Sequence, residues 1–212
     1  PIGTSLNLKR MGYGTMQLPG THVWGPPHDK SAALAVLREV IALGANHIDT
    51  AEFYGPGVSN QLIREALSPY SDRLTIVTKV GFVRGAGASW VSDLTPDGLK
   101  RAVHENLTSL GLETLDVVNL RLGGAHGPDN RSVAEPLEVL VKLQQQGLIR
   151  HIGLSNVSPT QFAEAKSITT IVCVQHQYNL FKRDDDEFID ALAAQGVAYV
   201  PFFPLGVLSP LQ

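Results

Sequence analysis

The sequence predicts an α/β fold, a (β/α)8 TIM barrel of parallel strands, of which these 212 residues would cover about seven strands. Short apolar or β-branched runs alternate with longer stretches whose apolar residues have helical spacing. Polar residues close these runs one after another, as expected where a barrel carries its chemistry at the strand ends. The composition, 43% hydrophobic and 17% charged, indicates one globular domain, which we expect to span residues 1–212.

Seven candidate strands are apolar enough for a parallel sheet that helices cover. A closed (β/α)8 barrel needs eight strands and roughly 250 residues, so this chain is one strand and its helices short. We therefore expect the C-terminal unit of a longer natural chain, an eighth strand with its helices, to follow Gln212. The seven strands are Met11–Thr15, Ala45–Asp49, Leu74–Lys79, Val117–Arg121, His151–Leu154, Ile171–Gln175 and Ala198–Phe203.

Six candidate helices separate the strands, and several carry start and stop signals. Asp29 is the predicted N-cap of the first helix, which ends at Gly44. Proline at the first helical position marks the starts of two others. The remaining helices are Ser59–Leu67, Thr95-Pro96 to Gly111, Ala134–Gln146, one that Ser158-Pro159 begins, and Asp184–Gln195.

The alternative architecture is an open doubly wound sheet, which usually carries a glycine-rich fingerprint after its first strand. The nearest approach here, Gly85-Ala86-Gly87, lacks the third glycine and follows the third strand instead. We interpret it as a loop.

The composition also argues against several classes of function. A net charge of -3 argues against sequence-independent nucleic-acid binding, which needs a basic face. No apolar run reaches the ~18 residues of a membrane span, and the lone Cys173 is typical of a reducing compartment. We expect a cytoplasmic protein without a metal site; the sequence does not indicate the oligomeric state.

Five consecutive strands end in polar residues that would converge on one rim of the barrel. A lone charge beside apolar neighbours is costly, so Asp49 and Lys79 are expected to pair. A purely structural ion pair is one interpretation. The other is catalytic, because Tyr54 can fold back over the same rim, and a neighbouring ammonium lowers the pKa of a phenol. The strand-end residues are Asp49, Lys79, Arg121, Ser155-Asn156 and Gln175.

Six segments, in chain order, resemble the aldo-keto reductase family. The pattern with Arg121 is most similar to bacterial members linked to pyridoxal-type or other small aldehydes. The segments are Met11–Met16, His47–Gly55, Thr78-Lys79, Ile149–Asn156, Val174–Asn179 and Phe203–Gly206.

The resemblance implies an oxidoreductase that reduces an aldehyde or ketone, or oxidises the alcohol, by hydride transfer with NADP(H). On the family pattern Tyr54 is the general acid/base, with Asp49 and Lys79 as partners. The family's segment that binds the adenosine 2′-phosphate would follow Gln212, so the preference for NADP(H) is inherited from the resemblance. The implied cofactor-binding residues are Met16, Asp49, Ser155, Asn156, Gln175, Phe202, Leu205 and Gly206.

Other roles remain open for some of these residues. Helix capping and strand-end hydrogen bonds would also account for Ser155, Asn156 and Gln175. Phe202 falls where the family commonly has a tyrosine that stacks on the nicotinamide, but a barrel-core position would also suit a ring without a polar group.

Arg121 departs from the family, which usually has a histidine at the end of the fourth strand. Arginine does not release a proton at physiological pH, so it cannot share in proton relay. We hypothesise that Arg121 faces the carbonyl oxygen and stabilises its developing negative charge. The alternative is an arginine that turns outward or pairs with Glu52 or Asp116.

An apolar or aromatic carbonyl compound is the expected substrate, because loop aromatics would line the pocket. A catalytically silent nicotinamide-binding regulatory subunit is one alternative function. A Schiff-base lyase that uses Lys79 as nucleophile is another. The expected pocket walls are Trp24, Phe53, Phe82 and Trp90.

Overall fold

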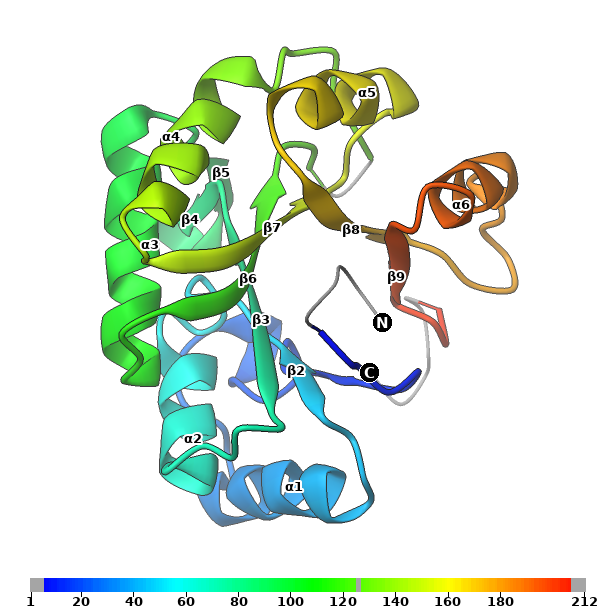
Figure 1. The fold of residues 1–212 in the computed structure, drawn as a ribbon. Helices are drawn as coiled ribbons and strands as arrows, with labels where there is room; N and C mark the ends of the chain where they lie inside the picture. The colour runs from blue at the N-terminus through cyan, green and yellow to red at the C-terminus, as the bar shows by residue number, and fades with distance from the viewer. Residues whose placement is uncertain (1–5, 125–126, 207–212) are drawn as a thin grey trace.

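A computed structural model describes residues 6–124 and 127–206 of the chain. Its main feature is a curved, all-parallel sheet with the order β1-β2-β3-β6-β7-β8-β9, in which β1 and β9 lie at the two ends (Figure 1). The strands are β1 Tyr13–Gly14, β2 His47–Asp49, β3 Thr75–Val80, β6 Leu115–Arg121, β7 Ile149–Ser155, β8 Ile171–Gln177 and β9 Ala198–Phe202.

Five helices cover the outer side of the sheet, each packed against the next, and α6 lies beside β9 (Figure 1). The predicted caps are present: Asp29 accepts a hydrogen bond from Ala32 N, and Thr95 accepts one from Gly98 N. The helices are α1 Lys30–Ala42, α2 Val58–Leu67, α3 Pro96–Leu110, α4 Ala134–Gln145, α5 Pro159–Ile168 and α6 Asp186–Ala193.

The predicted barrel architecture is confirmed, with small differences at the ends of elements. The first strand is shorter than the predicted Met11–Thr15, because only Tyr13 and Gly14 pair with β2. The last helix begins at Asp186 instead of Asp184, whose side chain pairs with Lys182.

The prediction missed an antiparallel hairpin, β4 Phe82–Arg84 and β5 Trp90–Ser92. It follows β3 and occupies the connection to α3. The segment interpreted as a loop, Gly85-Ala86-Gly87, lies at its tip and includes one 3₁₀ turn, Ala86–Ala88. A second 3₁₀ turn, Thr21–Val23, lies between β1 and α1.

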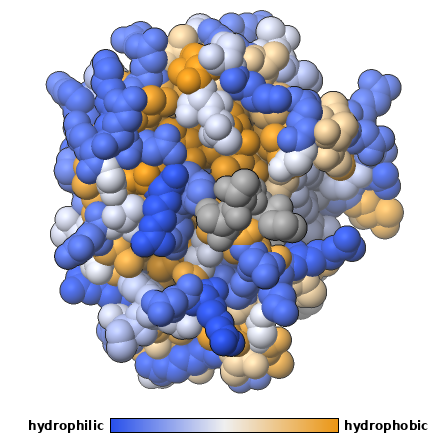
Figure 2. Space-filling view, viewed as in Figure 1, coloured by the Kyte–Doolittle hydropathy of each residue, from blue (hydrophilic) through white to orange (hydrophobic). Residues whose placement is uncertain are grey.

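Two apolar clusters lie on the two sides of the sheet. The larger one fills the space between the sheet and the helices, with Leu37, Leu99 and Leu137 completely buried. A smaller cluster, which includes Val77, Val117 and Cys173, lies on the other side of the same strands. Figure 2 shows apolar surface gathered in the middle of the viewed face, with hydrophilic side chains around it. Among the described residues, no helix is both long and apolar enough to span a bilayer.

Candidate active site

Strand register brings the predicted strand-end residues together. Arg121 pairs with Ser155 across β6 and β7, and Ser155 pairs with Gln175 across β7 and β8. Lys79 on β3 pairs with Asn119, which lies two residues before Arg121 on β6. Because side chains alternate between the two faces of a strand, these residues all point to the inside of the curved sheet.

Lys79 is 2% exposed and lies at the centre of this rim. Its Nζ forms a short hydrogen bond and ion pair with Asp49 Oδ1, and it donates a second hydrogen bond to the carbonyl oxygen of Thr50 at 2.9 Å. Gln175 Nε2 donates to the other oxygen of Asp49 at 2.8 Å. Burial opposes the charge of Lys79, but Asp49 and Tyr54 favour it more strongly, so the pKa of Lys79 is raised above its ordinary value.

Tyr54 lies over the same ammonium group. Lys79 Nζ is 5.2 Å from the centre of the Tyr54 ring, and the tyrosine is only 5% exposed. Backbone hydrogen bonds fix its loop: Tyr54 N donates to Ala51 O at 3.0 Å, and Ser59 N donates to Tyr54 O at 3.2 Å. The structure therefore places Tyr54, Lys79 and Asp49 in one group, as the sequence predicted.

A buried polar network supports the loop that carries Tyr54. Asn60 accepts a hydrogen bond from Thr50 Oγ1 at 2.8 Å and donates to Asn106 Oδ1 at 3.0 Å. Both Asn60 Nδ2 and Ser109 Oγ donate to Glu52 Oε2, at 2.7 and 2.6 Å. Burial raises the pKa of Glu52, although these two hydrogen bonds oppose the shift.

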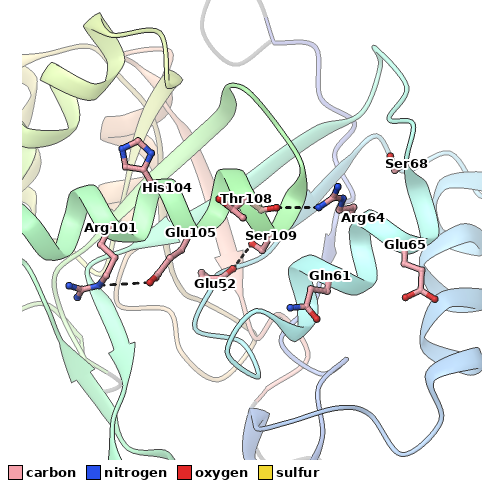
Figure 3. Close-up of a pocket in the computed structure, with 10 residues that line it drawn as sticks. All are labelled: Glu52, Gln61, Arg64, Glu65, Ser68, Arg101, His104, Glu105, Thr108 and Ser109. Atoms are coloured by element: carbon pink, nitrogen blue, oxygen red, sulfur yellow. Dashed lines mark hydrogen bonds and ion pairs between the residues drawn. The ribbon is translucent and has the colours of Figure 1, made fainter.

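Glu52 also borders a cleft of about 820 Å³ on the outer side of the barrel, between α2 and α3 (Figure 3). Acidic, basic and uncharged polar side chains line this cleft, which borders the loop that carries Tyr54 through Glu52. The lining residues besides Glu52 are Gln61, Arg64, Glu65, Ser68, Arg101, His104, Glu105, Thr108 and Ser109.

Arg121 lies at the rim between two aromatic rings. Its guanidinium carbon is 5.4 Å from the centre of the Phe82 ring and 5.7 Å from that of Phe202. Burial lowers the pKa of Arg121, and the nearby Tyr54 and Asp49 oppose this. The alternative pairings do not occur: Asp116 binds Arg150 at 2.9 Å, and Glu52 is bound as described above.

Two atoms at the rim are buried without a hydrogen-bond partner, Ser155 Oγ and Gln175 Oε1. Such atoms cost free energy unless a ligand satisfies them. A primary amide, with two donors and one acceptor, has the complementary chemistry, so these residues fit a nicotinamide carboxamide. Asn156 adopts φ 54° and donates to the carbonyl oxygens of Gly123 and Gly124 at 3.3 and 2.6 Å, so its oxygen is the atom left for a ligand.

The other predicted cofactor-binding residues lie in different surroundings. Met16 packs against the cluster that contains Tyr54, and half-buried Phe202 faces Arg121. Leu205, by contrast, is 94% exposed on the turn after β9, and Gly206 N bonds back to Phe203 O at 3.0 Å. The structure thus brings Met16 and Phe202 to the rim but leaves the Leu205 side chain in solvent.

Three of the four predicted pocket residues form an aromatic wall next to Tyr54, which we define as Phe53, Phe82 and Trp90. The Phe53 ring centre lies 5.3 Å from that of Tyr54, 6.4 Å from Phe82 and 5.5 Å from Trp90. The fourth, Trp24, lies farther out, with Arg84 over its ring.

Comparisons with known proteins bear on this geometry. A sequence model described as "Aldo/keto reductase family" matches residues 10–209. The chain belongs to the aldo-keto reductase family. It is 60% identical over 213 aligned positions to the pyridoxine 4-dehydrogenase of Escherichia coli, covering 100% of this chain and 74% of that protein.

Solved aldo-keto reductase structures are also similar. The holo form from Bacillus halodurans superposes with a TM-score of 0.79 at 29% identity, over 94% of this chain and 64% of that one. A thermostable aldo-keto reductase crystallised with the inhibitor epalrestat has a TM-score of 0.80 at 29% identity, over 99% and 74%. The protein is therefore an oxidoreductase of a family that uses nicotinamide cofactors.

Sequence reasoning missed the layer directly below the rim in this aldo-keto reductase. Asn119, Gly153 and Cys173 meet there, and Cys173 Sγ lies 3.3 Å from Asn119 Oδ1. A Cβ at Gly153 would lie 2.1 Å from that oxygen and 2.6 Å from the sulfur. Burial raises the pKa of Cys173 to about 12. Asn119 lies two residues before Arg121 on the same face of the strand, and that spacing could have identified it.

Proposed function

We propose that this protein reduces an aldehyde or ketone, or oxidises the corresponding alcohol, by hydride transfer with NADP(H), and that Tyr54 is the general acid/base. The observation that carries the proposal is the buried Lys79 ammonium, which Asp49 holds beside the Tyr54 ring. Burying a charge costs desolvation free energy, and such a charge is expected where a site shifts the pKa of a proton donor.

Tyr54 donates its proton to the carbonyl oxygen during reduction and takes it back during alcohol oxidation. Lys79 stabilises the phenolate that remains, because its ammonium lies beside the ring in a site with little solvent. Asp49 keeps Lys79 charged and fixes its direction. Arg121 faces the same space and supports negative charge on the substrate oxygen by electrostatics.

When bound, the reduced nicotinamide supplies the hydride. Ser155 and Gln175 would hold its carboxamide through their unpartnered oxygens, with the Asn156 oxygen beside them. Phe202 would present its ring at the nicotinamide position, and Met16 would lie near the adjoining ribose. Preference for NADP(H) over NAD(H) is part of the proposal and is tested by titration with both.

The aromatic wall supports a planar aromatic substrate. The similarity to a pyridoxine 4-dehydrogenase points the same way, because pyridoxine is a pyridine alcohol. We therefore extend the proposal to small aromatic aldehydes and alcohols of the pyridoxal type.

The Schiff-base alternative requires a neutral amine at Lys79. The raised pKa of this residue and its bonds to Asp49 favour the ammonium instead. Trapping with borohydride in the presence of an aldehyde should therefore leave Lys79 unmodified.

The test of the proposal is Tyr54→Phe, assayed with NADPH and a panel of aldehydes. We expect kcat to fall by about 10²- to 10⁴-fold, the usual contribution of general acid catalysis, with NADPH affinity nearly unchanged. The matched control is Tyr70→Phe, which loses a 2.7 Å hydrogen bond to Leu110 O away from the rim and should affect stability only.

Two results would contradict the proposal. Retained turnover in Tyr54→Phe would remove the role of Tyr54. A wild-type protein that binds NADPH but reduces no aldehyde in the panel would favour the regulatory-subunit alternative.

A further inference from the structure

Arg84, at the end of β4, joins the β4–β5 hairpin to the 3₁₀ turn before α1. Its Nη1 donates to Val23 O at 3.0 Å, and its Nη2 donates to His22 O at 3.0 Å and Ala88 O at 2.8 Å. A guanidinium presents its donors as a rigid planar fork, so one side chain can bind carbonyls from two separate loops at once.

The same guanidinium lies between two indole rings. Its central carbon is 4.2 Å from the centre of the Trp90 ring and 5.3 Å from that of Trp24. Throughout residues 6–124 and 127–206, no carboxylate pairs with Arg84. Carbonyl oxygens and aromatic faces therefore surround the charge, and the Nε of Arg84 is buried without a hydrogen-bond partner. We call Arg84, Trp24, Trp90 and the three bound carbonyl groups the arginine clamp.

The three carbonyl groups belong to residues with an unfavourable backbone. His22, Val23 and Ala88 have φ values of 61°, 58° and 59°. Residues with a Cβ rarely adopt this left-handed region, and the β-branched Val23 is especially disfavoured there. Such conformations persist only where their surroundings hold them, and Arg84 binds the carbonyl oxygen of all three.

The arginine clamp contacts the site directly. Val23 O, which accepts from Arg84, also accepts from Gly55 N at 3.1 Å, one residue after Tyr54. Trp90, which stacks on Arg84, lies 5.5 Å from Phe53 and 6.3 Å from Tyr54 between ring centres. One side chain thus fixes the aromatic wall relative to the loop that carries the tyrosine.

We infer that Arg84 is a positioning residue that holds the aromatic wall and so makes the pocket select planar aromatic carbonyl compounds over flexible aliphatic ones. This selection rests on the proposed carbonyl reduction. Tyr54 keeps its own backbone hydrogen bonds to Ala51 and Ser59, so loss of Arg84 acts on substrate binding more than on the chemical step.

The first test compares the kinetics of Arg84→Lys and Arg84→Met with those of the wild type. Lysine keeps the charge but lacks the planar fork, so both variants should raise KM for pyridine-4-carboxaldehyde by about fivefold to tenfold, the scale of one lost hydrogen bond. We expect kcat to change much less, KM for butanal to change little and the Kd of NADPH to stay the same. The matched control is exposed Arg73→Lys, between α2 and β3.

The second test does not depend on catalysis. The chain has two tryptophans, Trp24 and Trp90, and both lie in the arginine clamp. Tryptophan fluorescence therefore reports this structure alone, and acrylamide should quench it more strongly in both Arg84 variants than in the wild type. Arg73→Lys should leave the quenching unchanged.

The inference would be overturned if acrylamide quenched both Arg84 variants no more strongly than the wild type. It would also be overturned if both variants kept the wild type's preference for pyridine-4-carboxaldehyde over butanal. Full rescue by Arg84→Lys would also overturn it, because charge alone would then suffice. If the wild type reduces no aldehyde, the proposed function fails and so does the selection, while the quenching data still decide whether Arg84 holds the wall.

Discussion

The rim and the aromatic wall lie side by side but are held in different ways. At the rim, strand register places each polar side chain, and charged groups bond to one another, as Lys79 does to Asp49. At the wall, a short hairpin is fixed to a neighbouring turn through Arg84 and backbone carbonyl groups. Changes at the rim should therefore alter chemistry and stability together, whereas changes at the wall should alter substrate choice.

The largest effect is expected from Lys79→Met at the rim. The substitution leaves the Asp49 carboxylate with Gln175 as its remaining side-chain partner, and breaking such a pair costs about 3 kcal/mol of unfolding free energy. Turnover should fall by about 10³-fold or more, because the phenolate of Tyr54 loses its stabilising charge. Urea denaturation and aldehyde reduction measure the two losses.

The control for this prediction is Lys100→Met, which removes an exposed ion pair with Asp97 that contributes little. If Lys79→Met lost turnover but kept wild-type stability, the rim would be held by its backbone alone. The contrast drawn with the wall would then be wrong.

A smaller effect is expected from Ser155→Ala, which should stabilise the cofactor-free protein but weaken its binding of NADPH. Its Oγ is buried without a partner, so removal should raise the unfolding free energy of the cofactor-free protein by about 1 kcal/mol. The same change should raise the Kd of NADPH by about tenfold, since the carboxamide loses a hydrogen bond. Urea denaturation without cofactor and fluorescence titration with NADPH check the pair.

Ser59→Ala is the matched control for Ser155→Ala, because Ser59 Oγ is also buried but donates to Thr15 O at 3.1 Å. That variant should lose stability and bind NADPH as the wild type does. A loss of stability in Ser155→Ala would mean that its hydroxyl is already satisfied and is not reserved for a ligand.

The sequence predicted the rim because its signals are local. Polar residues such as Lys79 and Gln175 end apolar strands, and parallel strands bring their ends to one edge. Arg121 could be placed by the same rule, and the structure confirms that it does not pair with Glu52 or Asp116.

The wall could not be predicted in the same way. Each strand of its hairpin has three residues, too few for an alternation pattern to be recognised. The partners of Arg84 are backbone oxygens whose availability depends on positive φ values at His22, Val23 and Ala88. Side-chain identity gives no signal for these conformations, since none of the three is glycine.

The smallest effect is expected from Glu52→Gln, which tests the support behind the rim. Burial raises the pKa of Glu52 in the folded protein above its ordinary value of 4.5. The folded protein therefore binds more protons than the unfolded chain from about pH 4.5 upward, and its unfolding free energy decreases as pH rises through this interval. Glutamine keeps an oxygen that accepts from Asn60 and Ser109 but does not titrate, so Glu52→Gln should lessen this decrease. Urea denaturation from pH 4.5 to 7.5 measures the difference, with the exposed Glu138→Gln as control. Equal pH dependence of the unfolding free energy in Glu52→Gln and the wild type would show that Glu52 titrates as an ordinary surface carboxylate.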